Sequence, residues 1–81
     1  MSVRVELLYF ASLRDAAGIA RESVDTDATD LRALYEEAQV RHRLPFPSLQ
    51  LRVAMDGAFA RWDDAPRDGA EIAFIPPVSG G

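Results

Sequence analysis

The residues of this sequence with the clearest capacity for chemistry are its last six, Pro76-Pro77-Val78-Ser79-Gly80-Gly81. They follow an apolar run at residues 72–75 that is typical of a strand in a hydrophobic core. The two prolines interrupt that strand, because proline lacks the N–H group that a sheet needs. Gly80 and Gly81 have no Cβ, so a terminal Gly-Gly presents a free carboxylate on a slim segment with few conformational limits. We therefore expect the carboxylate of Gly81 to be the working group of the chain.

Composition limits the other functions that this chain could have. Its 81 residues make one small domain, and its net charge of -4 argues against partners that need a basic surface, namely nucleic acid and anionic membranes. The sequence has no cysteine and one histidine, so neither a thiolate nor a histidine cluster is available for a metal, and we expect neither a metal site nor a bound cofactor. The first residues do not resemble a signal peptide, and no apolar run is long enough to span a membrane. We expect a cytoplasmic protein.

Alternating apolar and polar residues predict several strands. They cover residues 3–10, 19–25, 49–56, 58–62 and 71–75. A short helical turn is predicted at residues 11–18, where Gly18 suits the left-handed cap conformation. The longest helix is predicted at residues 30–43, with Thr29 as its N-cap. Its apolar residues recur at helical spacing and are Leu31, Leu34, Tyr35 and Ala38.

This order of elements predicts an α+β fold, because one amphipathic helix covers only one face of a sheet. The arrangement that fits is the β-grasp, a mixed sheet of about five strands packed on one main helix. The last strand is apolar on both faces, which favours a central position, parallel to the first strand. We expect a β-grasp domain at residues 1–75 and a flexible tail at residues 76–81.

The pattern also predicts an apolar surface that the helix does not cover. If the first strand turns Val5, Leu7 and Tyr9 toward the helix, the opposite face carries Leu8, Phe10, Ala73 and Ile75. An uncovered apolar patch beside the tail is expected to be a docking site. The alternative is that the loop carrying Trp62 folds over this patch. The other aromatic residues, Tyr9, Tyr35, Phe46 and Phe74, are assigned to the core.

The two ends of the chain resemble a known family. The ending at residues 74–81 is similar to the C-terminus of the MoaD-type sulfur carriers, the small subunits of molybdopterin synthase. The opening at residues 7–18 is similar to that family's apolar strand, which is followed by Phe-Ala, by Leu-Arg and an acidic residue, and by a closing Gly. Residues 53–57 and 68–72 stand where the family has its two hairpin signals, so the resemblance spans the whole chain.

The resemblance implies a ubiquitin-like fold and a reaction cycle. An E1-like adenylyltransferase and sulfurtransferase would adenylate Gly81 with ATP, and sulfur would replace AMP to give a thiocarboxylate. No phosphate-cradling glycine loop is present, so ATP must be bound by the activating partner. The tail would then enter the large synthase subunit, in a complex that the resemblance suggests is a heterotetramer. There it would give sulfur to cyclic pyranopterin monophosphate. The chain would be an enzyme only as the sulfur-donor subunit of that transferase.

The resemblance also assigns roles to particular residues. Gly81 would carry the reacting group, and Gly80 would pass a narrow channel in the partner. The residues expected to contact partners are Leu8, Phe10, Arg14, Ile75, Pro76, Pro77, Val78 and Ser79. For Arg14, a solvated position on the short helix is equally compatible with the sequence.

Three other functions remain compatible with the residues. One is a sulfur carrier for another pathway, such as thiazole synthesis or tRNA thiolation. Another is a ubiquitin-like modifier attached to lysines of other proteins; because the chain contains no lysine, it could not form chains on itself. The last is an interaction module whose Gly-Gly end is idle.

Overall fold

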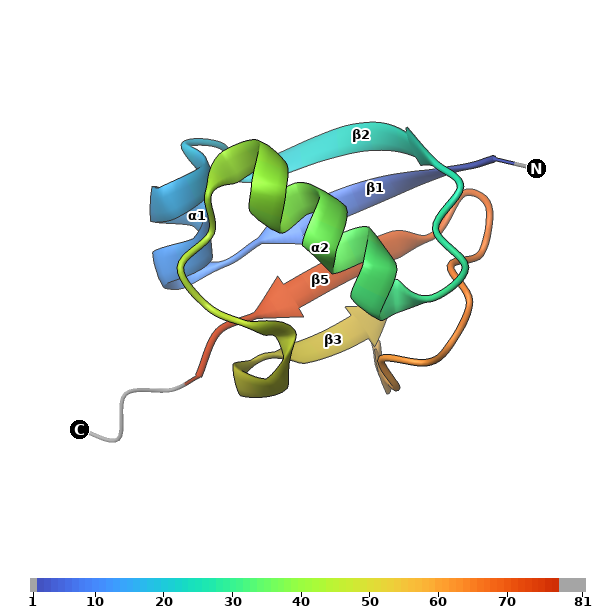
Figure 1. Cartoon of the computed structure of the whole chain (residues 1–81). Coiled ribbons are helices and arrows are strands. Elements are labelled where there is room, and N and C mark those ends of the chain that lie inside the picture. Colours follow the sequence, from blue (N-terminus) through green and yellow to red (C-terminus); the bar gives the residue numbers. More distant parts are fainter. Residues whose placement is uncertain (1, 78–81) are drawn as a thin grey trace.

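The computed structural model describes residues 2–77, which form a mixed five-stranded sheet with one long helix across one face (Figure 1). The elements in chain order are β1 (Val3–Tyr9), α1 (Ala11–Ala17), β2 (Arg21–Thr26), α2 (Leu31–His42), the 3-10 turn η1 (Ser48–Gln50), β3 (Arg52–Met55), β4 (Ala58–Ala60) and β5 (Glu71–Ile75). The strands lie in the order β2-β1-β5-β3-β4, and only the central β1–β5 pair is parallel among these neighbours. The predicted α+β fold of the β-grasp type is confirmed.

The hydrophobic core lies between α2 and the sheet. Along β1 the side chains of Val5, Leu7 and Tyr9 are buried, and on β5 those of Ile72 and Phe74 are fully buried. The predicted stripe of α2 meets them, because Leu31, Leu34, Tyr35 and Ala38 are all buried. Phe74 is the centre of an aromatic group, with ring centroids 5.0 Å from Tyr35, 6.1 Å from Tyr9 and 6.2 Å from Trp62.

The first turn of α2 is capped from two directions. Its N-cap is Asp30, not the predicted Thr29, because an Asp30 carboxylate oxygen accepts a hydrogen bond of 2.8 Å from the backbone N–H of Ala33. The loop between β4 and β5 supplies two further acceptors, since the carbonyls of Asp64 and Trp62 accept from the N–H groups of Leu31 and Arg32. These bonds satisfy amide groups that a helix start leaves without partners, and they fix the loop against the helix.

Four strands, β1 to β4, differ from their predicted bounds at one end or both. Residues 48–50 form a 3-10 turn instead of the start of a strand, because Pro47 and Ser48 accept hydrogen bonds from the N–H groups of Gln50 and Leu51. The side chain of Leu49 is therefore 89% exposed. The edge strand β4 ends at Ala60, since the chain turns there and carries Trp62 to the core.

The short helix α1 lies at the end of the sheet where β5 ends (Figure 1). Phe10 is its N-cap and has extended backbone geometry, so the chain turns directly from β1 into the helix. Gly18 closes α1 with a φ of 78°, as predicted for a left-handed cap. This arrangement places Phe10 and α1 beside the position at which β5 leaves the sheet.

Glu22 on β2 connects the edge of the sheet to the end of α2. One of its carboxylate oxygens, Oε2, lies 2.6 Å from Tyr9 Oη, 2.9 Å from an Arg41 guanidinium nitrogen and 2.8 Å from His42 Nε2. Burial raises the pKa of Glu22, but the hydrogen bonds from Tyr9, Arg41 and His42 outweigh it and lower the pKa from 4.5 to about 2. The lone histidine is thus a mostly buried structural residue.

This cluster predicts an acid-sensitive contribution to stability. A carboxyl whose pKa is lower in the folded state stabilises the fold above its unfolded pKa, and that contribution is lost as the pH falls from about 4.5 toward 2. We expect the melting temperature of the unchanged protein to fall more steeply between pH 5 and pH 3 than that of Glu22→Gln, since the variant lacks this titration. Thermal unfolding followed by circular dichroism measures both slopes, and equal slopes would contradict this role of Glu22.

Candidate functional site

The face of the sheet opposite α2 carries an apolar row that crosses four strands. Strand register places Leu8 of β1 beside Ala73 of β5, Ala73 beside Ala54 of β3, and Ala54 beside Phe59 of β4. Residues directly opposite each other on paired strands lie on the same face. Phe10 and Ile75 lie two residues further along the chain than Leu8 and Ala73. We call the row together with these two residues the open-face patch. Its predicted members Leu8, Phe10, Ala73 and Ile75 thus lie on the uncovered face.

Two aromatic side chains give the open-face patch much of its exposed area. The side chain of Phe59 is 71% exposed and that of Phe10 is 46% exposed. The Arg52 guanidinium lies 5.7 Å from the centre of the Phe59 ring and borders the patch on this side. At the opposite side the row ends at Arg21, which forms ion pairs with Glu6 and Glu71. Charged groups thus border an apolar strip, an arrangement typical of interaction surfaces.

The alternative prediction that the Trp62 loop covers this patch is wrong. The Trp62 ring stacks on Phe74 with an interplanar angle of 11° and packs against Tyr35 of α2. Phe74 points toward α2, so Trp62 lies on the helix side of the sheet. This loop therefore leaves the open face uncovered.

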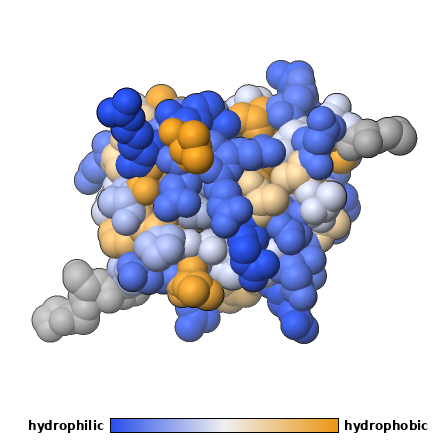
Figure 2. Space-filling view, in the orientation of Figure 1, coloured by the Kyte–Doolittle hydropathy of each residue, from blue (hydrophilic) through white to orange (hydrophobic). Residues whose placement is uncertain are grey.

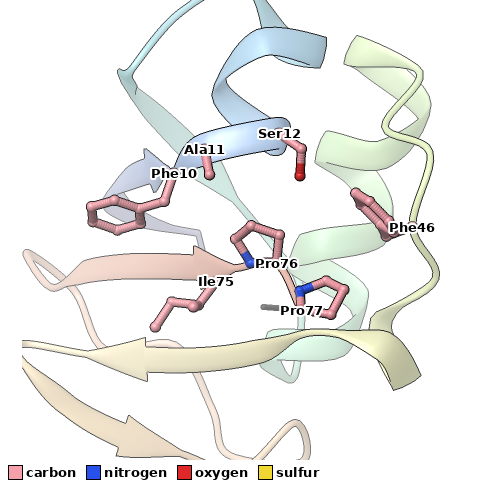
Figure 3. Close-up of a pocket in the computed structure, with 7 residues that line it drawn as sticks. All are labelled: Phe10, Ala11, Ser12, Phe46, Ile75, Pro76 and Pro77. Carbon is pink, nitrogen blue, oxygen red and sulfur yellow. The ribbon is translucent and has the colours of Figure 1, made fainter. Parts of the chain in front are cut away.

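A groove surrounds the position at which the chain leaves the sheet. It has a volume of about 840 Å³ and is lined by Phe10, Ala11, Ser12, Phe46, Ile75, Pro76 and Pro77. Figure 3 shows Phe10 and Ile75 on one side of Pro76, Phe46 on the other side, and Ser12 directed toward the groove from α1. We call this the tail-base groove. None of its lining residues is charged, and apart from backbone groups its only polar group is the Ser12 hydroxyl.

The tail-base groove and the open-face patch are continuous, because Phe10 and Ile75 belong to both. Pro76 is buried, whereas Pro77 is exposed. The predicted tail therefore begins with a residue packed into the domain, and the chain leaves the surface at Pro77.

The structure brings together five of the predicted partner residues. These are Leu8, Phe10, Ile75, Pro76 and Pro77. Arg14 is exposed on α1 but does not line the groove, so its position agrees with a solvated helix residue. Val78, Ser79, Gly80 and Gly81 lie outside the described residues.

Sequence reasoning missed five residues of the open-face patch and the tail-base groove, namely Ala11, Ser12, Phe46, Ala54 and Phe59. Phe59 was detectable, since the two-residue turn at Asp56-Gly57 forces Phe59 opposite Ala54, on the face that Leu8 occupies. Ala54 follows from the same register. Phe46 was assigned to the core, but its half-buried side chain lines the tail-base groove. No periodic signal marks it, because it lies between Pro45 and Pro47 in a segment that is neither helix nor strand.

The rest of the described surface offers fewer features. Figure 2 shows that the side of the molecule carrying α2 is mostly hydrophilic, with hydrophobic residues scattered singly. Within residues 2–77, no group of three or more His, Cys, Asp or Glu side chains is placed to hold a metal ion. None of the described helices is long and apolar enough to cross a membrane.

Comparison with known proteins identifies the family. The model of the ThiS family matches residues 7–81. The chain belongs to the ThiS family. Two relatives are named molybdopterin synthase sulfur carrier subunit. The one from Mycobacterium tuberculosis is 33% identical, over 98% of this chain and 99% of its own length. The one from Escherichia coli is 30% identical, over 95% of this chain and 99% of its own length.

Solved structures agree with this membership in the ThiS family. A putative molybdopterin converting factor subunit 1 from Pyrococcus furiosus is 28% identical with a TM-score of 0.78, over 94% of this chain and 99% of that one. SAMP1 from Haloferax volcanii is 26% identical with a TM-score of 0.80, over 96% of this chain and 99% of that one. A complex of subunits 1 and 2 of the molybdopterin-converting factor from Helicobacter pylori contains a chain with a similar fold. The identity is 24% and the TM-score 0.64, over 98% of this chain and 100% of that one.

Proposed function

We propose that this chain is the sulfur-carrier subunit of a molybdopterin synthase, and that Gly81 carries the reactive carboxylate. The observation that carries the proposal is the placement of the tail base. Strand β5 is the central strand of the sheet. At its C-terminal end the chain leaves the sheet through an uncharged groove that is continuous with the open-face patch. A partner can thus bind the apolar surface and receive the end of the chain in a single encounter.

Membership in the ThiS family supports the chemistry of this proposal. The family model extends to Gly81, and relatives with the carrier name align over nearly all of their length. A terminal carboxylate has a pKa of roughly 3.5, so it is ionised at neutral pH and reacts poorly with nucleophiles. Attack of this carboxylate on the α-phosphorus of ATP expels pyrophosphate and gives an acyl-adenylate. A sulfur nucleophile then displaces AMP and leaves a thiocarboxylate.

The proposal requires two partners in succession. An E1-like activating enzyme binds ATP and forms the acyl-adenylate, since this chain offers no phosphate-binding loop. The large synthase subunit then receives the thiocarboxylate, whose sulfur attacks cyclic pyranopterin monophosphate to form a thioester. Water cleaves the acyl–sulfur bond, which leaves the sulfur on the pterin and returns the tail to a carboxylate. The Helicobacter pylori complex of two subunits supports a partner of this kind. We extend the proposal to a heterotetramer, in which each large subunit accepts one tail.

Intact-mass measurement tests the proposed activation. Co-expression with the activating enzyme is expected to add about 16 Da to this chain, because sulfur replaces one carboxylate oxygen. The matched control is the chain expressed without that enzyme, which is expected to keep its unmodified mass. An unchanged mass under both conditions, with an active enzyme, would contradict the proposal.

A second function, that of a protein modifier, is favoured by one observation. This is the likeness to SAMP1 from Haloferax volcanii, whose name stands for small archaeal modifier protein 1. A ubiquitin-like modifier uses the same activated carboxylate but transfers the acyl group to amines of other proteins. The experiment just described separates the two functions. A mass gain without adducts favours sulfur transfer, whereas adducts of this chain on many cellular proteins would favour the modifier. A carrier for another sulfur pathway would show the mass gain and then fail to give its sulfur to the pterin precursor.

A further inference from the structure

On the Phe46 side of the tail-base groove, the contacts that fix the chain come from α2 and not from the tail. The Phe46 backbone carbonyl accepts hydrogen bonds from Tyr35 Oη at 2.6 Å and from Gln39 Nε2 at 3.0 Å. Tyr35 itself is fully buried on the face of α2 that packs against the sheet. Pro45 and Pro47 restrict the backbone on either side of Phe46. Tyr35, Gln39 and the two prolines therefore fix the Phe46 backbone, and packing of the Phe46 side chain against the core restricts the ring before any partner arrives.

A pre-formed wall of this kind reduces what a partner loses on binding. Ordering a mobile side chain at an interface costs roughly 0.5–1.5 kcal/mol, and a side chain held in advance avoids part of that cost. The Phe46 ring is only half-buried, so part of its apolar surface remains for a partner to cover. The ring lies on the opposite side of Pro76 from Phe10 and Ile75 (Figure 3). The base of the tail thus has apolar walls on both sides.

The composition of the groove selects the chemistry of its occupant. All seven lining residues are uncharged, and a charged side chain placed there would lose its hydration without gaining a counter-ion. The groove also encloses Pro76 and Pro77, from which the tail extends. A protein that accepts the tail in a channel must bring the rim of that channel against these two prolines. The occupant is therefore an apolar side chain from that rim.

We propose that Phe46 and Ser12 line a second docking site, in which the large synthase subunit inserts an apolar side chain at the base of the tail. This inference rests on the proposed function and extends it, because it adds a contact on the side of the tail away from the open-face patch. Phe46 acts here as a binding residue for the partner, while Tyr35 positions it from the core.

Calorimetric titration of the full chain with the large subunit encoded in the same genome tests this site. Ser12→Asp places a carboxylate in the groove from an exposed position in the first turn of α1, where an acidic residue is compatible with the helix. We expect the dissociation constant to rise about tenfold or more, because the apolar contact would have to desolvate that charge. Phe46→Ser removes the wall and is expected to weaken binding by a similar factor.

Matched variants separate the groove from general effects of charge and exposure. Ala65→Asp adds the same charge at an exposed residue in the loop between β4 and β5, which lies at the end of the sheet opposite α1 (Figure 1). Leu49→Ser removes an apolar side chain that is 89% exposed and does not line the groove. Both controls are expected to bind within about twofold of the unchanged chain. Melting temperatures of all four variants identify any loss that comes from unfolding.

The outcomes distinguish this inference from the proposed function. If Ser12→Asp binds as tightly as the unchanged chain while Phe59→Asp on the open-face patch binds poorly, the groove site is wrong and docking by the open face stands. If the unchanged chain does not bind the large subunit, the proposed function fails, and this inference fails with it. Weak binding of Ser12→Asp and Phe46→Ser, with normal binding of both controls, is the result that we expect.

Discussion

Gly81→Ala is expected to abolish sulfur transfer while leaving the domain fully folded. Under the proposed function, the carbonyl carbon of Gly81 reacts inside the active sites of two other proteins. A methyl group on the adjacent Cα would displace the reacting carbon or block its entry, and a displacement of about 1 Å can reduce a rate about 100-fold. We expect thiocarboxylate formation or its transfer to fall by at least that factor in a reconstituted system. The melting temperature should not change, since the core consists of residues between Val5 and Phe74.

The control for this prediction is an exposed substitution to alanine elsewhere in the chain. Val40 on α2 is 81% exposed and contributes to neither the open-face patch nor the tail-base groove, so Val40→Ala should retain full transfer. Unchanged activity of Gly81→Ala in the same assay would refute the role of Gly81 as the reacting residue.

Phe74→Ala is expected to cause the largest loss of stability in this domain. The Phe74 ring is fully buried and contacts the rings of Tyr9, Tyr35 and Trp62, so its removal leaves a cavity at the centre of the core. Such truncations cost about 3–5 kcal/mol. Folded domains have a free energy of unfolding of roughly 5–15 kcal/mol, so the variant would lose between about a fifth and all of it. Urea denaturation followed by Trp62 fluorescence measures the change.

Phe59 offers a control with the same substitution. It also lies on a strand, but it is 71% exposed, and its described aromatic interaction is with the Arg52 guanidinium. An exposed cation–π contact contributes about 0.5–1 kcal/mol, so Phe59→Ala should lose no more than that. Equal losses for the two variants would show that the aromatic group around Phe74 does not dominate the core.

The fold was predictable because its strongest patterns agree with one another. The alternation in β1, the apolar stripe of α2 and the doubly apolar β5 each predict a single burial pattern, and the structure has all three. The strand predicted after Gly18 is also present, and β2 is the outermost strand beside β1. Together these elements position the tail beside Phe10 and α1.

The errors fall where local bonds or tertiary contacts override a pattern. Leu49 continues the alternation of β3, yet a 3-10 turn after Pro47 exposes it. Trp62 has no periodic partner in the sequence, and its position depends on the carbonyl bonds that fix its loop to the start of α2. Phe46 is held by Tyr35 across eleven residues, a contact that no local pattern predicts. The groove therefore became visible only in the assembled structure.

Sulfur transfer in a single turnover tests the central claim most directly. The chain carrying a thiocarboxylate would be mixed with the large subunit and cyclic pyranopterin monophosphate, without ATP or the activating enzyme. We expect molybdopterin to form in proportion to the thiocarboxylate consumed, and the mass of the chain to return to that of the carboxylate form. Loss of the precursor without molybdopterin, or a thiocarboxylate that survives in the complex unchanged, would contradict the assignment of this chain as the sulfur donor.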